Sequence, residues 1–146
     1  GQLVSATGLA ADLALHIRRT RPRRLLSWDP WARYQLHPDH RVAGFATLDA
    51  VLAAGNPHYH PEQLGAAIRP HRVDEVYIFG TDQPDRWVDV TDSLERKLAV
   101  IACHHSQVEP ASGLIEDVRR CNADYGQRSG HPYAEAFKVL RPFCDT

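Results

Sequence analysis

The tetrapeptide HPDH, from His37 to His40, has the residue types and the spacing of a chemical site. The two histidines are three positions apart, so a helix that starts here places both imidazoles on one side of its first turn. Neutral imidazole is the commonest metal ligand in proteins, and the positive end of a helix dipole disfavours the protonated ring. A catalytic zinc normally takes three protein ligands, which two histidines cannot supply. Spacing alone leaves two interpretations open, a partial metal site and an ordinary polar helix start.

The other histidines and the nearest serine give weaker signals. His58 and His60 could act as ligands on one face of an extended segment, but the neighbouring prolines favour loop positions. His104 and His105 fall at an expected helix end, where a protonated imidazole is favourable. Ser106 is not in a G-x-S-x-G turn, so the sequence does not support a serine hydrolase. Of the remaining histidines, we expect His16 and His71 at the surface and leave His131 unassigned.

Alternating helices and strands must position HPDH. Apolar residues spaced four apart predict a helix over 6–20, RLLSW predicts a central strand over 24–28, and HPDH opens a helix over 38–54. Further elements are expected as follows: a loop over 55–65, a strand over 73–80, an extended piece over 86–91, a helix from Asp92 or Ser93 to His104, a helix over 112–124, and a glycine-containing segment over 125–132.

This order of elements predicts an α/β fold. We expect a Rossmann-like layered arrangement with a mostly parallel sheet flanked by helices. In such sheets ligands bind at the carboxyl ends of the strands, which is where RLLSW leads into HPDH.

Length and composition predict a single globular domain over 1–146. Apolar residues make up 43%, no apolar run approaches the length of a membrane span, and no secretory signal is evident. The net charge of -1 gives no reason to expect a nucleic-acid partner. The arginines of 18–24 are interpreted as cations closing a helix. The three cysteines, Cys103, Cys121 and Cys144, are an odd number and form no C-x-x-C pair, which favours a cytoplasmic location.

Several stretches, in order, resemble the PIG-L/LmbE family of zinc-dependent N-deacetylases. They are HPDHRVAG, VDEVYIFGTDQPDRWVDVTDSLERKLAVIACHHSQ and GHPYAEAFKVL, which together contain the family's H-P-D-H, Y-x-F, D-x-T, H-x-S-Q and Y-A-E-x-F elements. The order of these elements is more specific than any one of them. The resemblance implies a hydrolase that removes the acetyl group from an N-acetylglucosamine-type conjugate, with one zinc ion as cofactor.

The resemblance also implies roles for individual residues. His40 matches a metal-ligand histidine, and His37 matches the catalytic histidine that stabilises the oxyanion and assists the leaving amine. Asp39 belongs with the catalytic residues and is expected to orient the turn or an imidazole. Trp31 and Tyr34, in the variable loop before HPDH, are expected to contact the substrate. Supporting positions, for which packing is an equally simple explanation, are Asp89, Lys97, His104, Ser106, Gln107 and Glu135.

The sequence departs from the family in one respect. The family's A-H-P-D-D motif, which carries two zinc ligands and the general base, has no counterpart in these 146 residues. We therefore expect the C-terminal part of a larger deacetylase fold without its first strands, which holds zinc poorly alone and needs an N-terminal half or a homo-oligomer. Two alternatives stay open: an inactive remnant or substrate-binding domain of the same fold, and an unrelated hydrolase that uses His58 and His60.

Overall fold

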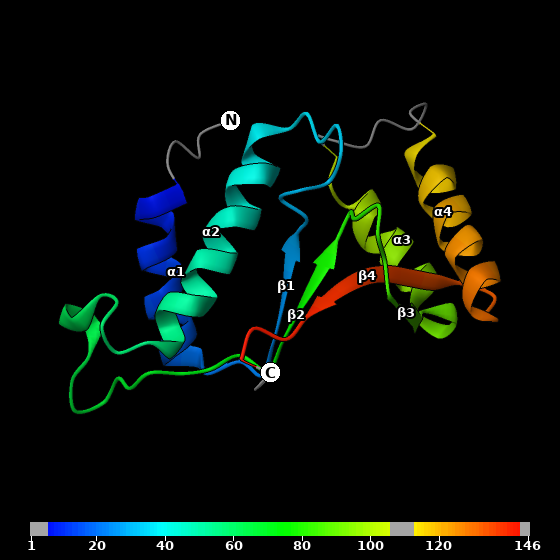
Figure 1. Ribbon diagram of the computed structural model, residues 1–146. Helices are drawn as coiled ribbons and strands as arrows, with labels where there is room; N and C mark the ends of the chain where they lie inside the picture. Colours follow the sequence, from blue (N-terminus) through cyan, green and yellow to red (C-terminus); the bar gives the residue numbers. More distant parts are fainter. Residues whose placement is uncertain (1–5, 106–112, 144–146) are drawn as a thin grey trace. The chain divides into compact units, whose positions relative to one another are not determined.

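The computed structural model describes residues 6–105 and 113–143 and has an α/β fold (Figure 1). The helices and strands are α1 (Ala6–Thr20), β1 (Arg24–Trp28), α2 (Pro38–Gly55), β2 (Glu75–Phe79), β3 (Arg86–Asp89), α3 (Leu94–Ala102), α4 (Leu114–Ser129) and β4 (Ala134–Leu140), with short 3-10 helices at Pro61–Gln63 and Thr91–Ser93. The strand order is β1-β2-β4-β3. β1 and β2 are parallel and β4 is antiparallel to β2. The predicted α/β class is confirmed, with a mixed sheet.

The chain divides into two compact units. The first comprises the described residues up to Pro84 together with those from Phe137 onward, and the second comprises Asp85–Ala136. β4 begins in the second unit and ends in the first. The expectation of a single domain over 1–146 stays a prediction.

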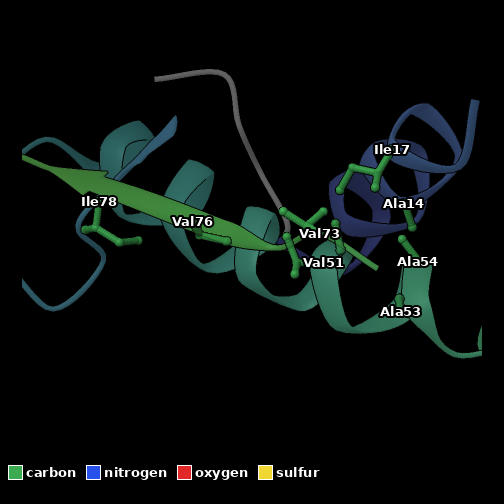
Figure 2. Packing of buried hydrophobic residues seen from close by; sticks show 9 residues of the cluster. Ala14, Ile17, Val51, Ala53, Ala54, Val73, Val76 and Ile78 are labelled. Carbon is green, nitrogen blue, oxygen red and sulfur yellow. The ribbon is translucent and has the colours of Figure 1, made fainter. Parts of the chain in front are cut away.

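The core of the first unit lies between α1, α2 and β2 (Figure 2). Val76 and Ile78 alternate with partly exposed neighbours along β2 and point toward the helices, as a half-buried strand requires. Small side chains at the helix contact allow α1 and α2 to pack closely. The buried members of this cluster are Ala14, Ile17, Ala50, Val51, Ala53, Ala54, Val73, Val76 and Ile78. This packing fixes α2 alongside β1 and β2, so the start of α2 lies at the carboxyl end of β1 (Figure 1).

Arg18 corrects the interpretation of the arginine-rich segment. Its side chain is buried, with 2% of the residue exposed, and it closes the end of α2 rather than that of its own helix. The guanidinium donates hydrogen bonds of 2.7–3.3 Å to the carbonyl oxygens of Ala53, Ala54, Asn56, Tyr59 and His60 and to Oε1 of Gln63. Last-turn carbonyls of a helix lack partners within the helix. Arg18 therefore satisfies the end of α2 and holds the loop that follows.

His71 is likewise not the surface residue that was expected. It is partly buried, and its Nε2 lies 2.8 Å from the carbonyl oxygen of Pro22. The contact ties the segment before β2 to the segment before β1.

In the second unit, α4 is longer than predicted. It continues past residue 124 to Ser129, and Gly130 ends it in the left-handed conformation with φ of 77°. Glycine is needed at position 126 within the helix, because a Cβ there would lie 2.6 Å from the carbonyl oxygen of His131. One glycine of the segment 125–132 thus permits close packing, and the predicted end of the helix at residue 124 was wrong.

Polar contacts join the elements of this second unit. Lys97 on α3 donates hydrogen bonds to Glu135 on β4 and to the buried Asn122 on α4. Arg119 on α4 pairs with Glu95 on α3. Across residues 6–105 and 113–143, no helix combines the length and the apolar character needed to cross a membrane.

Candidate functional site

The HPDH turn begins α2, as predicted. His37 occupies the N-cap position with extended backbone angles (φ −72°, ψ 115°), and Pro38 is the first helical residue. Proline suits this position because the missing N–H would have no helical partner there. Gln35 closes the turn from the preceding loop: its Oε1 accepts the His37 N–H at 3.0 Å, and its carbonyl oxygen accepts a hydrogen bond from Arg41. The turn therefore has a defined conformation before any ligand binds.

Three aromatic rings are stacked at this turn. The His40 ring lies parallel to Trp28, with centroids 3.7 Å apart and planes 9° apart. His37 stacks on His40 with centroids 4.3 Å apart and planes 15° apart. Trp28 also contacts Phe79 at the end of β2. His40 is thus held between Trp28 and His37 at the carboxyl end of β1.

Gly44 explains why α2 can approach the strand so closely. A Cβ at this position would lie 2.8 Å from the Trp28 carbonyl oxygen and 2.9 Å from Cβ of Pro30. Any larger residue would push the helix away from the end of β1. The absence of a side chain at Gly44 is therefore part of what places His40 against Trp28.

The environment of His40 favours a neutral imidazole. Its Nδ1 is buried and has no hydrogen-bond partner among the described residues. Burial lowers the pKa of His40, charge on His37 lowers it further, and Asp39 raises it. A buried ring nitrogen without a partner costs about 1–3 kcal/mol when it is left unsatisfied. A neutral imidazole with an unused nitrogen is the form in which histidine binds metals, so His40 fits the role of a metal ligand.

The described part of the chain does not complete a metal site. No group of three or more histidine, cysteine, aspartate or glutamate side chains within residues 6–105 and 113–143 is arranged to hold a metal ion. His58 is exposed, and His60 is a loop residue in the left-handed conformation with φ of 48°. These positions agree with the prediction that both belong to a loop.

The substrate residues expected in the variable loop lie in the first unit. Trp31 is exposed and packs edge-on against Phe45 of α2, with ring centroids 5.9 Å apart. Tyr34 has a positive φ of 61° and is 86% exposed. Both rings lie outside the core and are accessible on the same loop that leads to HPDH.

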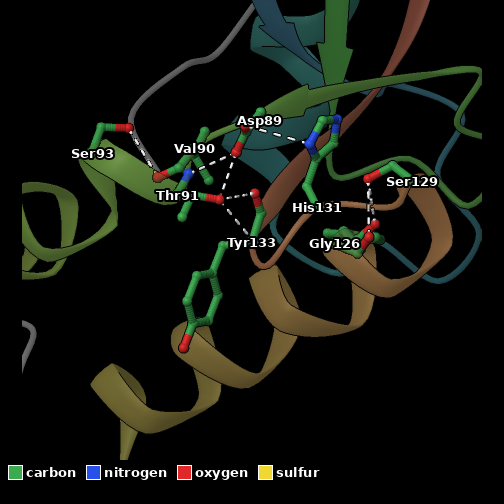
Figure 3. Close-up of polar contacts among 9 residues, drawn as sticks. Asp89, Val90, Thr91, Ser93, Gly126, Ser129, His131 and Tyr133 are labelled. Atoms are coloured by element: carbon green, nitrogen blue, oxygen red, sulfur yellow. Dashed lines mark hydrogen bonds and ion pairs between the residues drawn. The ribbon is translucent and has the colours of Figure 1, made fainter.

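Those supporting residues that the structure describes lie in the second unit, where several of them have a local partner. Asp89 Oδ1 accepts the N–H and hydroxyl of Thr91 at 2.9 and 2.6 Å, and Asp89 Oδ2 lies 3.4 Å from Nδ1 of His131 (Figure 3). The Thr91 hydrogen bonds are the main reason that the pKa of Asp89 is lowered, with His131 adding to the effect. Asp89 thus shapes the turn between β3 and α3.

The remaining supporting residues are placed only in part. Lys97 and Glu135 form an ion pair, and His104 is exposed just beyond the end of α3. Ser106 and Gln107 lie outside the described residues. The assignment of all these residues to a reaction stays a prediction.

The sequence interpretation missed Trp28 and Asp29. The Trp28 ring stacks against the His40 ring. Asp29 is a buried carboxylate, 7% exposed, at the carboxyl end of β1. The available signal was the dipeptide itself, a large aromatic and an acid at the end of the predicted central strand.

The comparisons with known proteins point to deacetylases. No protein-family model matches the sequence. The chain is 41% identical over 131 residues to a diacetylchitobiose deacetylase of Thermococcus kodakarensis, an alignment that covers 88% of this chain and 49% of that protein. The chain therefore spans about half the length of this curated relative.

Solved structures show the same fold. The N,N'-diacetylchitobiose deacetylase from Pyrococcus horikoshii, in complex with an inhibitor, superposes with a TM-score of 0.85 at 28% identity, covering 94% of this chain and 55% of that one. The conserved protein TT1542 from Thermus thermophilus has a TM-score of 0.75 at 24% identity, covering 99% of this chain and 64% of that one.

A further neighbour shows that the fold alone does not decide the reaction. The 4-carboxy-2-hydroxymuconate hydratase GalB from Pseudomonas putida KT2440 has a TM-score of 0.65 at 22% identity, covering 96% of this chain and 61% of that one. Sequence similarity distinguishes these neighbours, and it is higher to the deacetylases than to the hydratase. The chain is similar in sequence and in fold to about half of a diacetylchitobiose deacetylase, which supports the resemblance to deacetylases of the PIG-L/LmbE type.

Proposed function

We propose that this chain is the part of a zinc-dependent N-deacetylase that carries the HPDH turn. The reaction is hydrolysis of the N-acetyl group of an N-acetylglucosamine-type conjugate, which releases acetate and a free amine. The observation that carries the proposal is the His40 ring, held between Trp28 and His37 with a buried nitrogen that has no partner in the described structure. The similarity to the Thermococcus kodakarensis deacetylase supplies the reaction class.

The two histidines have different environments and take different roles. His40 would be one ligand of the zinc ion, which when bound supplies a Lewis acid for the acetyl carbonyl and for water. His37 is exposed at the outer side of the stack, where its cationic form stabilises the oxyanion and delivers a proton to the leaving amine. A charge on His37 lowers the pKa of His40, so protonation of one ring favours the neutral form of the other. The lowered pKa of His40 suits a neutral metal ligand.

The other assignments follow from the same proposal. Asp39, in the first helical turn, orients HPDH, while Trp31 and Tyr34 contact the sugar. Supporting residues are Asp89, Lys97, His104, Ser106, Gln107 and Glu135. The remaining zinc ligands and the general base come from another segment or another chain, and the enzyme acts in the cytoplasm on a small molecule.

A second candidate function is a substrate-binding or inactive domain of the same fold. The absence of a three-ligand cluster among residues 6–105 and 113–143 favours it. The two candidates differ in metal content, because only the deacetylase requires a complete zinc site.

Elemental analysis of zinc in the purified protein, followed by an acetate-release assay with N,N'-diacetylchitobiose, tests the proposal. The chain alone should hold zinc poorly. When the segment or chain that carries the remaining ligands is present, we expect about one zinc per chain, loss of zinc in His40→Ala, and retention of zinc in His37→Ala with a fall in kcat of about 10²–10⁴-fold. His58→Ala, in an exposed loop, is the matched control and should change neither quantity. Zinc retained in His40→Ala, or an unchanged rate in His37→Ala, would contradict the assigned roles. No zinc in that completed protein, even after zinc is added, would favour the second candidate.

A further inference from the structure

A small pocket lies at the carboxyl ends of β1 and β2. It has a volume of about 170 Å³, and its lining includes Asp29 and Trp31 after β1, Thr81, Asp82 and Gln83 after β2, and Lys138 on β4. Carboxyl ends of neighbouring parallel strands are where ligands bind in open α/β sheets. All of these residues belong to the first unit, which also contains the HPDH turn.

Trp28 adjoins both the pocket and the stacked histidines. Asp29 directly follows Trp28 along the chain, while Thr81 directly follows Gly80. A Cβ at Gly80 would lie 3.1 Å from the Trp28 ring, and Gly80 has a positive φ of 69°, a conformation that favours glycine. The Trp28 ring thus contacts both His40 and the turn that begins the 81–83 segment.

Asp29 provides a buried acceptor in this pocket. Asp29 is 7% exposed, and within the described residues its carboxylate accepts one hydrogen bond, from the backbone N–H of Trp31 to Oδ1 at 2.8 Å. A buried carboxylate is costly unless further donors satisfy it. Lys138 contributes a positive charge to the same lining, and hydroxyl groups of a ligand would contribute additional donors.

Trp31 and Gln83 provide the other features of a carbohydrate site. The Trp31 ring is 62% exposed and is oriented by its edge-on contact with Phe45. An oriented aromatic ring offers a large apolar surface at the side of a polar pocket. Gln83 is exposed, and its backbone N–H donates to the Thr81 hydroxyl at 3.2 Å, so the segment presents an amide side chain at the rim.

We propose that this pocket binds one pyranose ring of the substrate through its hydroxyl groups, namely the ring that is not deacetylated. The proposal rests on the proposed deacetylase function and deepens it. Pockets for drug-sized ligands are about 300–1,000 Å³, so a volume of about 170 Å³ holds a single ring and not a disaccharide. The histidines of the HPDH turn are not among the described lining residues, so the proposal places the reacting acetamide outside this pocket.

Indole resonances provide a direct test with the intact protein. The chain has three tryptophans, so ¹H–¹⁵N spectra contain three indole signals, which Trp31→Phe and Trp87→Phe assign. Methyl β-glucoside, N-acetylglucosamine and N,N'-diacetylchitobiose are titrated separately. We expect all three sugars to shift the Trp31 signal and to leave the Trp87 signal in place. A shift with the N-acetylated sugars alone would overturn the proposal, because the pocket would then recognise the reacting acetamide.

Variants test the role of the carboxylate. Asp29→Asn keeps an acceptor for the backbone N–H of Trp31 but removes the negative charge. We expect the apparent Kd for the sugars to rise by about tenfold or more. Asp49→Asn makes the same chemical change on α2, away from the pocket lining, and should bind like the wild type. If Asp29→Asn does not fold, Gln83→Ala at the exposed rim takes its place. Equal affinity of the folded pocket variant and Asp49→Asn would refute the subsite.

Acetate release measured on the same samples separates the two proposals. Release of acetate with no shift of the Trp31 signal overturns the subsite and leaves the deacetylase function standing. A Trp31 shift with methyl β-glucoside in a protein that holds zinc but releases no acetate supports the subsite and contradicts the deacetylase function.

Discussion

Replacement of Arg18 by methionine should cause a large loss of stability. The buried guanidinium supplies hydrogen bonds to five backbone carbonyls and one amide oxygen at the end of α2 and in the loop after it. Methionine keeps the apolar part of the side chain but leaves these acceptors without donors. Hydrogen bonds to charged groups contribute about 1.5–3 kcal/mol each, but six such values would exceed the stability of many whole domains, about 5–15 kcal/mol. The values cannot add, because the loop can relax and admit water.

The cost of leaving a buried acceptor without its donor is a better guide to the magnitude. Each such acceptor costs about 1–3 kcal/mol, and the contacts to the Ala53 and Ala54 carbonyls are buried, so we expect Arg18→Met to lower the free energy of unfolding by about 2–6 kcal/mol. Arg18→Lys should fall between this variant and the wild type, since an ammonium retains the charge but cannot reproduce the planar fork of donors.

Urea unfolding followed by circular dichroism measures the change, with Arg19→Met as the control. Arg19 is the exposed neighbour on the same helix, and its substitution should alter the free energy by about 0.5 kcal/mol or less. Hydrogen exchange of the amides over 53–56 should accelerate in Arg18→Met, because the carbonyls at that helix end lose their donor. Equal unfolding midpoints and slopes for Arg18→Met and Arg19→Met would refute the role given to Arg18.

Three further substitutions test other contacts. Glu75 has a pKa below its ordinary value of 4.5, chiefly because of the hydrogen bond from Arg24. The ionised carboxylate therefore stabilises the folded state above pH 4.5, and this stabilisation is lost as the pH falls through the folded-state pKa. Glu75→Gln should therefore flatten the acid limb of a plot of Tm against pH. Gly44→Ala would place a Cβ 2.8 Å from the Trp28 carbonyl oxygen and should cost about 1–3 kcal/mol in urea unfolding, with a changed near-ultraviolet tryptophan signal; an unchanged Tm and spectrum would contradict close packing there. Lys97→Met leaves a buried amide oxygen and a carboxylate without their donor and should cost about 1–3 kcal/mol, whereas wild-type stability would show that the contact is dispensable.

Local patterns were sufficient to predict the elements around HPDH. The helix over 6–20 and the strand over 24–28 match α1 and β1, and the helix from residue 38 differs from α2 by one residue at its end. These segments combine clear apolar periodicity with strong boundary residues such as Pro38. Local sequence and tertiary structure agree here, so the start of α2 was predictable.

Features that depend on distant partners were not predictable. Arg18 stands among four other arginines in 18–24, and nothing local distinguishes the one that closes α2. Gly126 looks like a helix breaker, but the carbonyl of His131 requires a glycine at that point of α4. The stacking of His40 on Trp28 depends on how closely α2 passes over β1, which Gly44 permits. In each case the decisive contact joins segments that the sequence pattern treats separately.

The position of β4 in the sheet limits the order in which the strands can pair during translation. It is the last strand of the described chain, yet it pairs with β2 and lies between β2 and β3 in the sheet. Arg141, just after β4, reaches back to Glu75 across 66 residues, whereas Arg24 meets the same carboxylate across 51. Pairing over such separations is slow, because chain entropy is lost before the contacts form.

A nascent chain that has emerged only as far as α4 therefore has β1 and β2 available for pairing but no β4. One side of β2 then presents an open row of N–H and C=O groups, which can template pairing with another chain. During translation this edge is exposed for as long as the ribosome takes to complete the second unit and β4. Slow decoding between β2 and β4 would prolong that interval, and the yield of native protein should fall as the interval lengthens.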